Sequence, residues 1–212
     1  MEILITICGR GGSKSVIGKN IRNLNGKPLI AYSINHAIEF SKIFNNVTIG
    51  ISSDDQKILE TANKYGVKTE YIRPKKLATD QCGKVDVIKD LLFFHEKKEN
   101  KNFDIILDLD ITSPMRTILD LKKGFKKLLD DKDSINLFSV SNPNRNPYFN
   151  MVELKYNGYC KLIKNSNVKA RQMAPVVYDM NASFYFYKRN FFSKNYKRVV
   201  TEKSLCFLMD HV

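Results

Sequence analysis

The sequence lacks the features of a membrane protein and of the common catalytic triads. No apolar stretch approaches the ~20 residues that a membrane span needs, and no charged leader precedes the first apolar run. The cysteines are scattered without a CxxC pair, and the three histidines have no ligand-like spacing. Ser-His-Asp and Cys-His catalysis therefore find no support. We expect reduced thiols, no membrane partner and a cytoplasmic protein.

Acidic residues are in the minority, but this does not by itself define a partner. The 35 Lys and Arg residues exceed the 22 Asp and Glu residues, which gives a formal net charge of +13. A nucleic-acid-binding protein is one interpretation. However, the lysines are spread along the whole chain, and no RRM, KH or helix-turn-helix signature accompanies them. A solvated lysine-rich surface is favoured, with an anionic substrate explaining part of the excess, so no nucleic-acid partner is expected.

The most informative part of the chain is a Gly-rich segment at residues 8–20. Its sequence, CGRGGSKSVIGKN, follows a β-branched run at residues 3–7 that is typical of a buried strand. Two glycines allow a sharp turn and a close approach of backbone N–H groups to a ligand. Arg10, Lys14 and Lys19 add three cations. Donors and cations at the end of a strand indicate a polyphosphate site, and a Gly-rich turn with solvated lysines is the alternative.

Neither of two common nucleotide motifs explains this segment. Gly12 and Gly18 are separated by five residues rather than the four of a Walker P-loop. Lys19 is followed by Asn20 rather than by the Ser or Thr that would hold Mg²⁺. The GxGxxG fingerprint of dinucleotide-binding folds is also missing. The segment thus predicts a phosphate site of another kind.

Strand and helix patterns alternate over most of the 212 residues, which predicts one α/β domain with a mostly parallel sheet. Strands are expected at residues 3–7, 47–51, 67–72, 103–109, 134–140, 182–187 and 204–208. Helices are expected at 28–40, 53–65, 85–98 and 117–129. The alternation stops at SNPNRNPYFN, and Asn157-Gly158 predicts a hairpin beyond it. We therefore expect an α/β domain of residues 1–140 and 181–212, with 141–180 as an antiparallel excursion.

Two carboxylates end the strand expected at residues 103–109. Asp108 and Asp110 lie at i and i+2, so they share one face of the sheet. Ligands of open α/β sheets bind at the carboxyl ends of strands, where the Gly-rich segment also lies. Hard oxygen ligands beside a triphosphate indicate Mg²⁺, and two strand-end carboxylates with one capping a helix are the alternative. Arg73, at a strand end, is expected to face a nucleotide or to lie on the surface.

Several motifs together resemble one family. RGGSKSVIGKN is followed in order by NGKPLIAYSI, ISSD, YIRP, TSPMR, NPYFN, RQMAP and YDMNASFYFYKR. They resemble the signature of the acylneuraminate cytidylyltransferases, or CMP-sialic acid synthetases, over essentially the whole chain. Within that family, LDLD before TSP, NPYFN and YDMNAS most resemble the branch that makes CMP-legionaminic acid.

The resemblance implies a Rossmann-like α/β nucleotidyltransferase that forms a homodimer. The excursion at residues 141–180 would be its dimerisation segment and reach into the neighbouring subunit's site. The implied reaction joins CTP and a nine-carbon α-keto acid sugar, of the legionaminic or sialic acid type, into a CMP-sugar with release of pyrophosphate. The sugar's anomeric hydroxyl attacks the α-phosphorus, and Mg²⁺ is the only cofactor implied. Catalysis is then mainly positioning and charge neutralisation.

The resemblance also implies roles for individual residues. The triphosphate would be held by Arg10, Gly11, Gly12, Ser13, Lys14 and Lys19. The catalytic cations among these would be Arg10, Lys14 and Lys19, with Lys14 nearest the reacting phosphate. The cytidine would be fixed by Asn20 and Arg73. The sugar acid would be contacted by Asp110, Asn150, Arg171, Gln172 and Tyr185, of which Arg171 suits the carboxylate. Mg²⁺ would bind Asp110 and Asp108, and the family's S-x-D-I-D stretch places further ligands beyond Val212.

Two other functions stay open. One is a nucleotidyltransferase for another sugar, such as Kdo, pseudaminic acid or a hexose 1-phosphate, because these enzymes share the fold logic. The other is a non-catalytic nucleotide-binding homologue.

Overall fold

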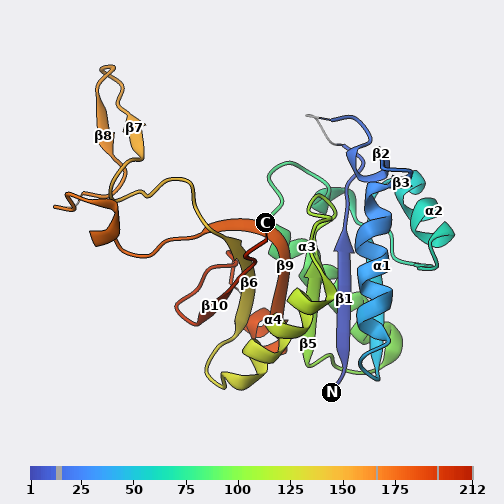
Figure 1. The fold of residues 1–212 in the computed structure, drawn as a ribbon. Helices are drawn as coiled ribbons and strands as arrows, with labels where there is room; N and C mark the ends of the chain where they lie inside the picture. Colours follow the sequence, from blue (N-terminus) through green and yellow to red (C-terminus); the bar gives the residue numbers. More distant parts are fainter. Residues whose placement is uncertain (13–15, 166, 195, 212) are drawn as a thin grey trace.

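The fold is built on a six-stranded, mostly parallel sheet with the strand order β10-β6-β9-β5-β1-β4 (Figure 1). The computed structural model describes residues 1–12, 16–165, 167–194 and 196–211. The strands are β1 (Ile3–Cys8), β4 (Val47–Ser52), β5 (Ile105–Leu109), β6 (Asn136–Ser141), β9 (Asp179–Lys188) and β10 (Ser204–Leu208). β1 runs parallel to β4 and β5, and β10 runs parallel to β6. β9 is antiparallel to both of its neighbours, β5 and β6. The predicted α/β class is confirmed.

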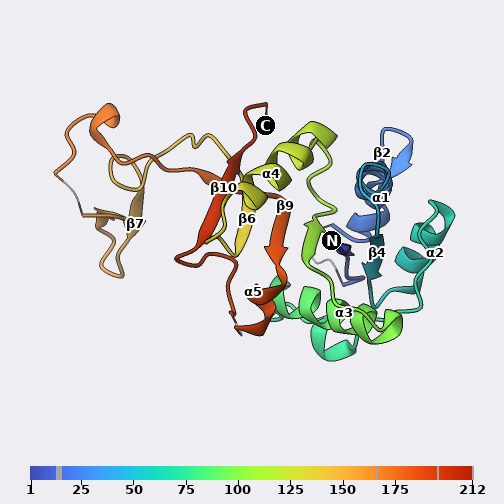
Figure 2. The same ribbon diagram turned by 90° about the horizontal axis from the view of Figure 1, so that it is seen from below.

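Helices cover both faces of this sheet (Figure 2). One face carries α1 (Leu29–Ser41), α2 (Gln56–Lys64) and α4 (Ile118–Asp130), and the other carries α3 (Lys84–Glu99) and α5 (Arg189–Ser193). Because both faces are buried, β1 is apolar at nearly every position. Ile3, Ile5 and Ile7 pack into one core cluster, and Leu4 packs into the other. No helix of the described residues is both long and apolar enough to cross a membrane.

Short elements connect these layers. They are η1 (Lys19–Ile21), β2 (Asn23–Leu24), β3 (Lys27–Pro28), η2 (Lys75–Leu77) and η3 (Arg171–Met173). The helix starts follow local chemistry: Pro28 precedes α1, and Thr117 and Asp120 form a reciprocal capping box on α4. The helix predicted at residues 53–65 begins after Asp55, whose side chain accepts a hydrogen bond from the Lys57 N–H at 2.8 Å. The cap is thus Asp55 rather than the predicted Ser53-Asp54.

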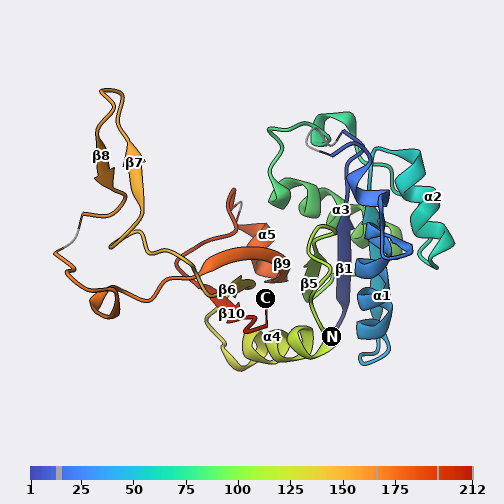
Figure 3. The same cartoon turned by 45° about the horizontal axis from the view of Figure 1, so that its top comes forward.

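An arm, residues 142–178, leaves the sheet between β6 and β9 and extends away from the α/β body (Figures 1 and 3). It carries a hairpin of β7 (Val152–Leu154) and β8 (Cys160–Leu162), which pair antiparallel. The hairpin predicted around Asn157-Gly158 is confirmed, with Gly158 at a φ of 83°. Many large apolar side chains of the arm are exposed: Met151, Val152, Leu154, Tyr156, Tyr159, Ile163, Met173, Val176 and Tyr178.

One predicted strand is wrong, because residues 67–72 run beside β4 as irregular backbone. Its alternating pattern reflects real burial, since Val67 and Tyr71 are buried. However, the Thr69 hydroxyl donates to the Ile51 carbonyl at 3.5 Å and accepts from the Tyr71 N–H at 3.1 Å. The Thr69 hydroxyl therefore makes hydrogen bonds that backbone groups would make if this segment paired with β4 as a strand.

Candidate functional site

A cavity of about 270 Å³ lies at the carboxyl ends of β1 and β4. It is lined by Cys8, Arg10, Arg73, Leu77, Thr79, Asp80, Cys82, Lys84 and Val87. Two residues predicted to hold a nucleotide, Arg10 and Arg73, thus face the same cavity although they are far apart in sequence. Ligands of open α/β sheets bind at the carboxyl ends of the strands, and the cavity lies at this end of the sheet. Burial, followed by the nearby Asp108 carboxylate, raises the pKa of the Cys8 thiol, so this wall of the cavity carries no thiolate.

The described part of the Gly-rich segment is tied down at three points. The Gly11 N–H donates to Asp54 Oδ1 at 3.1 Å, and Asn20 Nδ2 donates to the Arg10 carbonyl at 2.9 Å. Arg10 Nη2 forms an ion pair with Asp80 Oδ1 at 2.5 Å. Lys19 lies half-buried in η1, and Gly12 is exposed. Ser13 and Lys14 lie outside the described residues.

Arg73 is a preorganised cation in this cavity. It is only 5% exposed. Its Nε donates to Ser52 Oγ at 2.9 Å, and its Nη2 donates to the Ser52 carbonyl at 2.7 Å. Since β4 ends at Ser52, the last residue of a strand fixes the guanidinium in place. Its remaining donors can meet an anionic or carbonyl oxygen without a further loss of side-chain freedom.

A charged cluster joins this cavity to the end of β5. Lys84 Nζ lies 2.9 Å from Asp108 Oδ2 and 2.8 Å from Asp110 Oδ2, and 4.6 Å from the centre of the Tyr185 ring. Burial alone would lower the pKa of Lys84, but the two carboxylates raise it well above its ordinary value. Burial would raise the pKa of Asp110, but Lys84 and Thr112 hold it below the ordinary value. Lys84 and Asp110 are therefore both charged at neutral pH.

Arg116 holds the backbone beside this cluster through hydrogen bonds to two carbonyls. It is 2% exposed, and its donors reach Ser183 Oγ at 3.2 Å, Ser33 Oγ at 3.1 Å and the Ser113 carbonyl at 2.7 Å. It also donates to the Asp110 carbonyl, which accepts from Ser33 Oγ at 2.9 Å as well. Burial lowers the pKa of Arg116 to about 10, against the opposing effect of nearby carboxylates. The guanidinium thus fixes the backbone that carries Asp110.

Two of these residues, Lys84 and Arg116, have no role in the sequence-based assignment. The motif TSPMR does contain Arg116, and its position just before a capped helix is a signal of a structured loop. Lys84 is the first residue of α3, where a cation is disfavoured by the helix dipole. A lysine at the start of a helix therefore weakly indicates that acidic residues from elsewhere in the fold contact the lysine.

The residues predicted to contact the sugar fall into two groups. Asp110 and Tyr185 lie at the sheet, whereas Asn150, Arg171 and Gln172 lie in the arm. Asn150 Oδ1 accepts from the Asn146 N–H at 2.8 Å, and Arg171 Nη2 donates to the Pro143 carbonyl at 3.3 Å. A separate cavity of about 250 Å³ in the arm is lined by Pro143, Arg145, Asn146, Arg171, Gln172, Ala174, Pro175, Val176 and Val177. The structure of one chain does not join the two groups.

The predicted Mg²⁺ ligands do not fit a metal ion as they are arranged. Asp108 Oδ1 accepts from Thr6 Oγ1 at 2.8 Å, and Asp110 Oδ1 accepts from Thr112 N and Oγ1 at 2.8 and 2.7 Å. The two Oδ2 atoms share the Lys84 ammonium. Among the described residues, no group of three or more His, Cys, Asp or Glu side chains can hold a metal. A metal between these carboxylates would have to displace Lys84.

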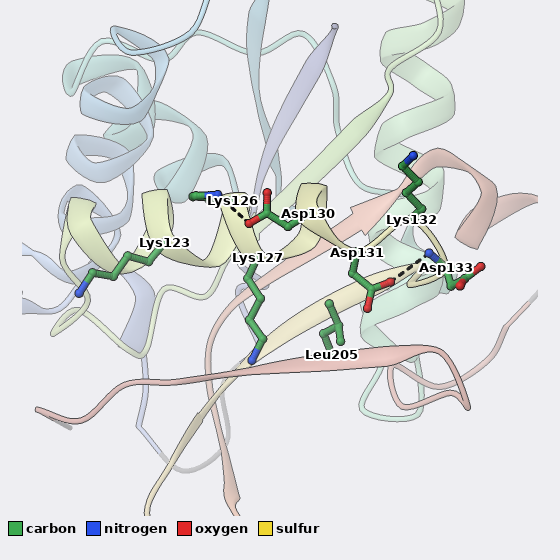
Figure 4. A pocket seen from close by; sticks show the side chains of 8 residues that line it. All are labelled: Lys123, Lys126, Lys127, Asp130, Asp131, Lys132, Asp133 and Leu205. Carbon is green, nitrogen blue, oxygen red and sulfur yellow. Dashed lines mark hydrogen bonds and ion pairs between the residues drawn. The ribbon is translucent and has the colours of Figure 1, made fainter.

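A larger hollow, of about 570 Å³, lies away from this site, between the end of α4 and β10 (Figure 4). Its lining consists of Lys123, Lys126, Lys127, Asp130, Asp131, Lys132, Asp133 and Leu205. Lys126 Nζ pairs with Asp130 Oδ2 at 2.7 Å, and Lys127 Nζ donates to the Cys206 carbonyl at 2.8 Å. The hollow borders the amino ends of β6 and β10, opposite to the edge where sheet ligands bind. We assign it no role in the site.

The fold and the cation-lined cavity define an α/β protein with an anion-binding site at the carboxyl ends of its strands. The fold is similar to that of CMP:2-keto-3-deoxy-manno-octonic acid synthetase complexed with CTP, with a TM-score of 0.68, 15% identity and coverage of 99% of this chain and 90% of that one. The family model described as Cytidylyltransferase matches residues 4–205. The chain therefore belongs to the cytidylyltransferase family.

Two relatives match nearly the whole chain. "Post-translational flagellin modification protein B" of Campylobacter coli is 40% identical, over 99% of this chain and 86% of the relative. "CMP-N,N'-diacetyllegionaminic acid synthase" of Campylobacter jejuni subsp. jejuni serotype O:2 is 41% identical, over 99% and 90%. The family predicted from the motifs is confirmed, and the chain is a nucleotidyltransferase.

Proposed function

We propose that the chain transfers CMP from CTP to a nonulosonic acid of the legionaminic or sialic acid type, releasing pyrophosphate. The observation that carries the choice of sugar is the 41% identity, over nearly the full length of both chains, with a CMP-N,N'-diacetyllegionaminic acid synthase. The cavity between the Gly-rich segment and Arg73 supports the choice of a triphosphate partner. The free thiols Cys8, Cys82, Cys160 and Cys206 agree with a cytoplasmic location.

The proposed mechanism is positioning plus charge neutralisation. The anomeric oxygen of the sugar forms a bond to the α-phosphorus, the bond from that phosphorus to the bridging β-phosphate oxygen breaks, pyrophosphate leaves, and the hydroxyl proton passes to solvent. Arg10, Lys14 and Lys19 neutralise the triphosphate, with backbone N–H groups of Gly11, Gly12 and Ser13 beside them. Arg10 exchanges its ion pair with Asp80 for a phosphate oxygen. Asn20 and Arg73 hold the cytidine. Mg²⁺ would supply further neutralisation on the phosphates.

A homodimer completes the proposed site. The apolar side chains on the arm, such as Leu154 at 74% exposure and Val176 at 80%, would be buried against a second subunit. The arm would then bring Asn150, Arg171 and Gln172 of one chain to Asp110 and Tyr185 of the other. Analytical ultracentrifugation of the full chain should give a dimer, and a monomer with full turnover would contradict this arrangement.

The substrate assignment is tested by pyrophosphate release. CTP, UTP and dTTP are each combined with legionaminic acid, N-acetylneuraminic acid, pseudaminic acid, Kdo and a hexose 1-phosphate. We expect release with CTP and a legionaminic or sialic acid. Release with a hexose 1-phosphate would overturn the sugar class. Nucleotide binding without release from any pair would identify a non-catalytic homologue.

Gly11→Ala should raise the KM for CTP by about tenfold, since the segment that holds the triphosphate must shift. A Cβ on Gly11 would lie 2.6 Å from Asp55 Oδ2 and 2.8 Å from Asp55 Cβ, closer than atoms can pack. The same loop would lose the Gly11 N–H contact with Asp54. Steady-state kinetics at saturating sugar measures the effect. A Gly50→Ala variant, whose Cβ would clash with His95 of α3, is the control for a general loss of stability. A CTP KM within twofold of the unmodified protein would contradict the prediction.

A further inference from the structure

Lys84 is a cationic residue at the first position of a helix, which is an unfavourable place for a positive charge. It begins α3 directly after Gly83, where the dipole of the helix opposes a positive charge. Its ammonium nevertheless lies within 3 Å of two carboxylates from the end of β5. It also lies over the Tyr185 ring, at 4.6 Å from the ring centre, where a cation is attracted by the π system. Three partners from β5, its following loop and β9 therefore outweigh the unfavourable helix position.

The carboxylates need this ammonium. Asp108 is 1% exposed, and a buried carboxylate without a compensating charge is strongly destabilising. Thr6 supplies a hydrogen bond to Asp108, but a hydroxyl carries no charge. Asp110, whose side chain is 22% exposed, has Thr112 as its only other side-chain donor among the described residues. Lys84 is thus the cation that allows two carboxylates to lie together.

The position of Lys84 links the two halves of the site. It lines the cavity that also contains Arg10 and Arg73, on the nucleotide side. On its other side it contacts Asp110 and Tyr185, which the proposed function places on the sugar side. An ammonium has three N–H donors, and the two carboxylates accept two of them. Lys84 therefore stands where the attacking sugar and the nucleotide meet.

We propose that Lys84 is a positioning residue of the transferase site, a fixed ammonium that occupies the place between Asp108 and Asp110 and orients Asp110 toward the sugar. The assignment to the sugar rests on the proposed function. It follows that the Asp108–Asp110 pair does not bind a divalent cation, and that a metal ion in the reaction is held by the nucleotide phosphates and other groups. The structure supports this through the four satisfied carboxylate oxygens.

The first test measures metal binding without turnover. Mn²⁺ is titrated into the full chain free of nucleotide, and unbound Mn²⁺ is followed by electron paramagnetic resonance. The unmodified protein, Asp108→Asn and Asp110→Asn should bind Mn²⁺ with the same affinity, within about threefold, because Lys84 already neutralises the pair. A tenfold or greater loss of affinity in either variant would show that the pair is a metal site and overturn the assignment.

The second test measures positioning. Lys84→Met should raise the KM for the sugar by about tenfold and change the KM for CTP much less, because Asp110 loses the group that orients it. Lys84→Arg, which keeps the charge, should restore most of the loss. Lys97→Met, an exposed lysine on the same helix, is the control. If Lys84→Met does not fold, the double variant Lys84→Met/Asp108→Asn removes one charge of each sign and reports the same KM. A sugar KM unchanged in the folded variant would overturn the proposal.

These tests separate two kinds of failure. If the unmodified protein releases no pyrophosphate with any sugar, the proposed function fails. The Mn²⁺ comparison needs no turnover, and it still decides whether Lys84 or a metal neutralises the pair.

Discussion

Arg116→Met should lower the free energy of unfolding by about 2–4 kcal/mol, a large part of the stability of a typical domain. The change removes donors to the carbonyls of Asp110 and Ser113 and to the hydroxyls of Ser33 and Ser183, in a place that is 2% exposed to water. Each buried acceptor that loses its partner contributes to the cost. Burial of the charged guanidinium is unfavourable and lowers the pKa of Arg116 to about 10. Removing this charge therefore offsets part of the cost.

Urea unfolding followed by circular dichroism measures this change, and an unchanged slope shows that the same transition is compared. Arg198→Met replaces an exposed arginine and should stay within about 0.5 kcal/mol of the unmodified protein. Arg116→Lys keeps the charge but not the planar fork, so we expect an intermediate value. An Arg116→Met protein as stable as the Arg198→Met protein would refute the role of Arg116 as the anchor of the Asp110 backbone.

Lys14→Ala should lower turnover at saturating substrates by about 10²–10³-fold, which is typical for the loss of one preorganised charge that stabilises a transition state. The reason is the increase of negative charge around the α-phosphate as pyrophosphate leaves. Lys14 itself lies outside the described residues, and its role rests on the resemblance of its motif. The neighbouring contacts of Arg10 and Gly11 support an anchored loop on that side of the cavity.

The kcat and the KM for CTP are measured separately, because a charge used only in the transition state lowers kcat and leaves KM nearly unchanged. The thermal midpoint should not change, since the sequence predicts a Gly-rich turn rather than part of the core at this position. Lys27→Ala, an exposed lysine of β3, is the control for a general change in charge. A Lys14→Ala enzyme that keeps more than about a third of the turnover would exclude Lys14 from the catalytic group.

The sheet was predictable where burial on both faces leaves a mostly apolar run, as in β1 and β5. The segment at residues 67–72 has the alternation of a half-buried strand, yet the Thr69 hydroxyl bonds to the edge of β4 and replaces the ladder. Such a competition between side-chain and backbone donors depends on the position of a neighbouring strand. A local pattern does not contain that information.

The site was predictable where local sequence creates it. Two glycines and nearby cations predict the proposed nucleotide loop. Arg73 was predicted from the end of a strand at residues 67–72 that does not form, yet it lines the same cavity as Arg10. Lys84 and Arg116 act through partners far away in sequence: Lys84 contacts Asp110, and Arg116 contacts Ser33 and Ser183. Only the folded topology of β5, β9, α1 and α3 brings these groups together.

The two ends of the arm are hydrogen-bonded neighbours, since Val140 pairs with Met180 and Ser141 pairs with Asp179. β6 and β9 therefore stay paired up to the residues from which the arm leaves the sheet. The backbone hydrogen bonds between these strands involve none of residues 142–178. Because of this, insertions, deletions and exchanges in that segment are insulated from the folding of the rest. Under the proposed function, in which the arm contacts the sugar, substitutions in the arm can change the recognised sugar and leave the nucleotide-binding residues of the sheet unchanged.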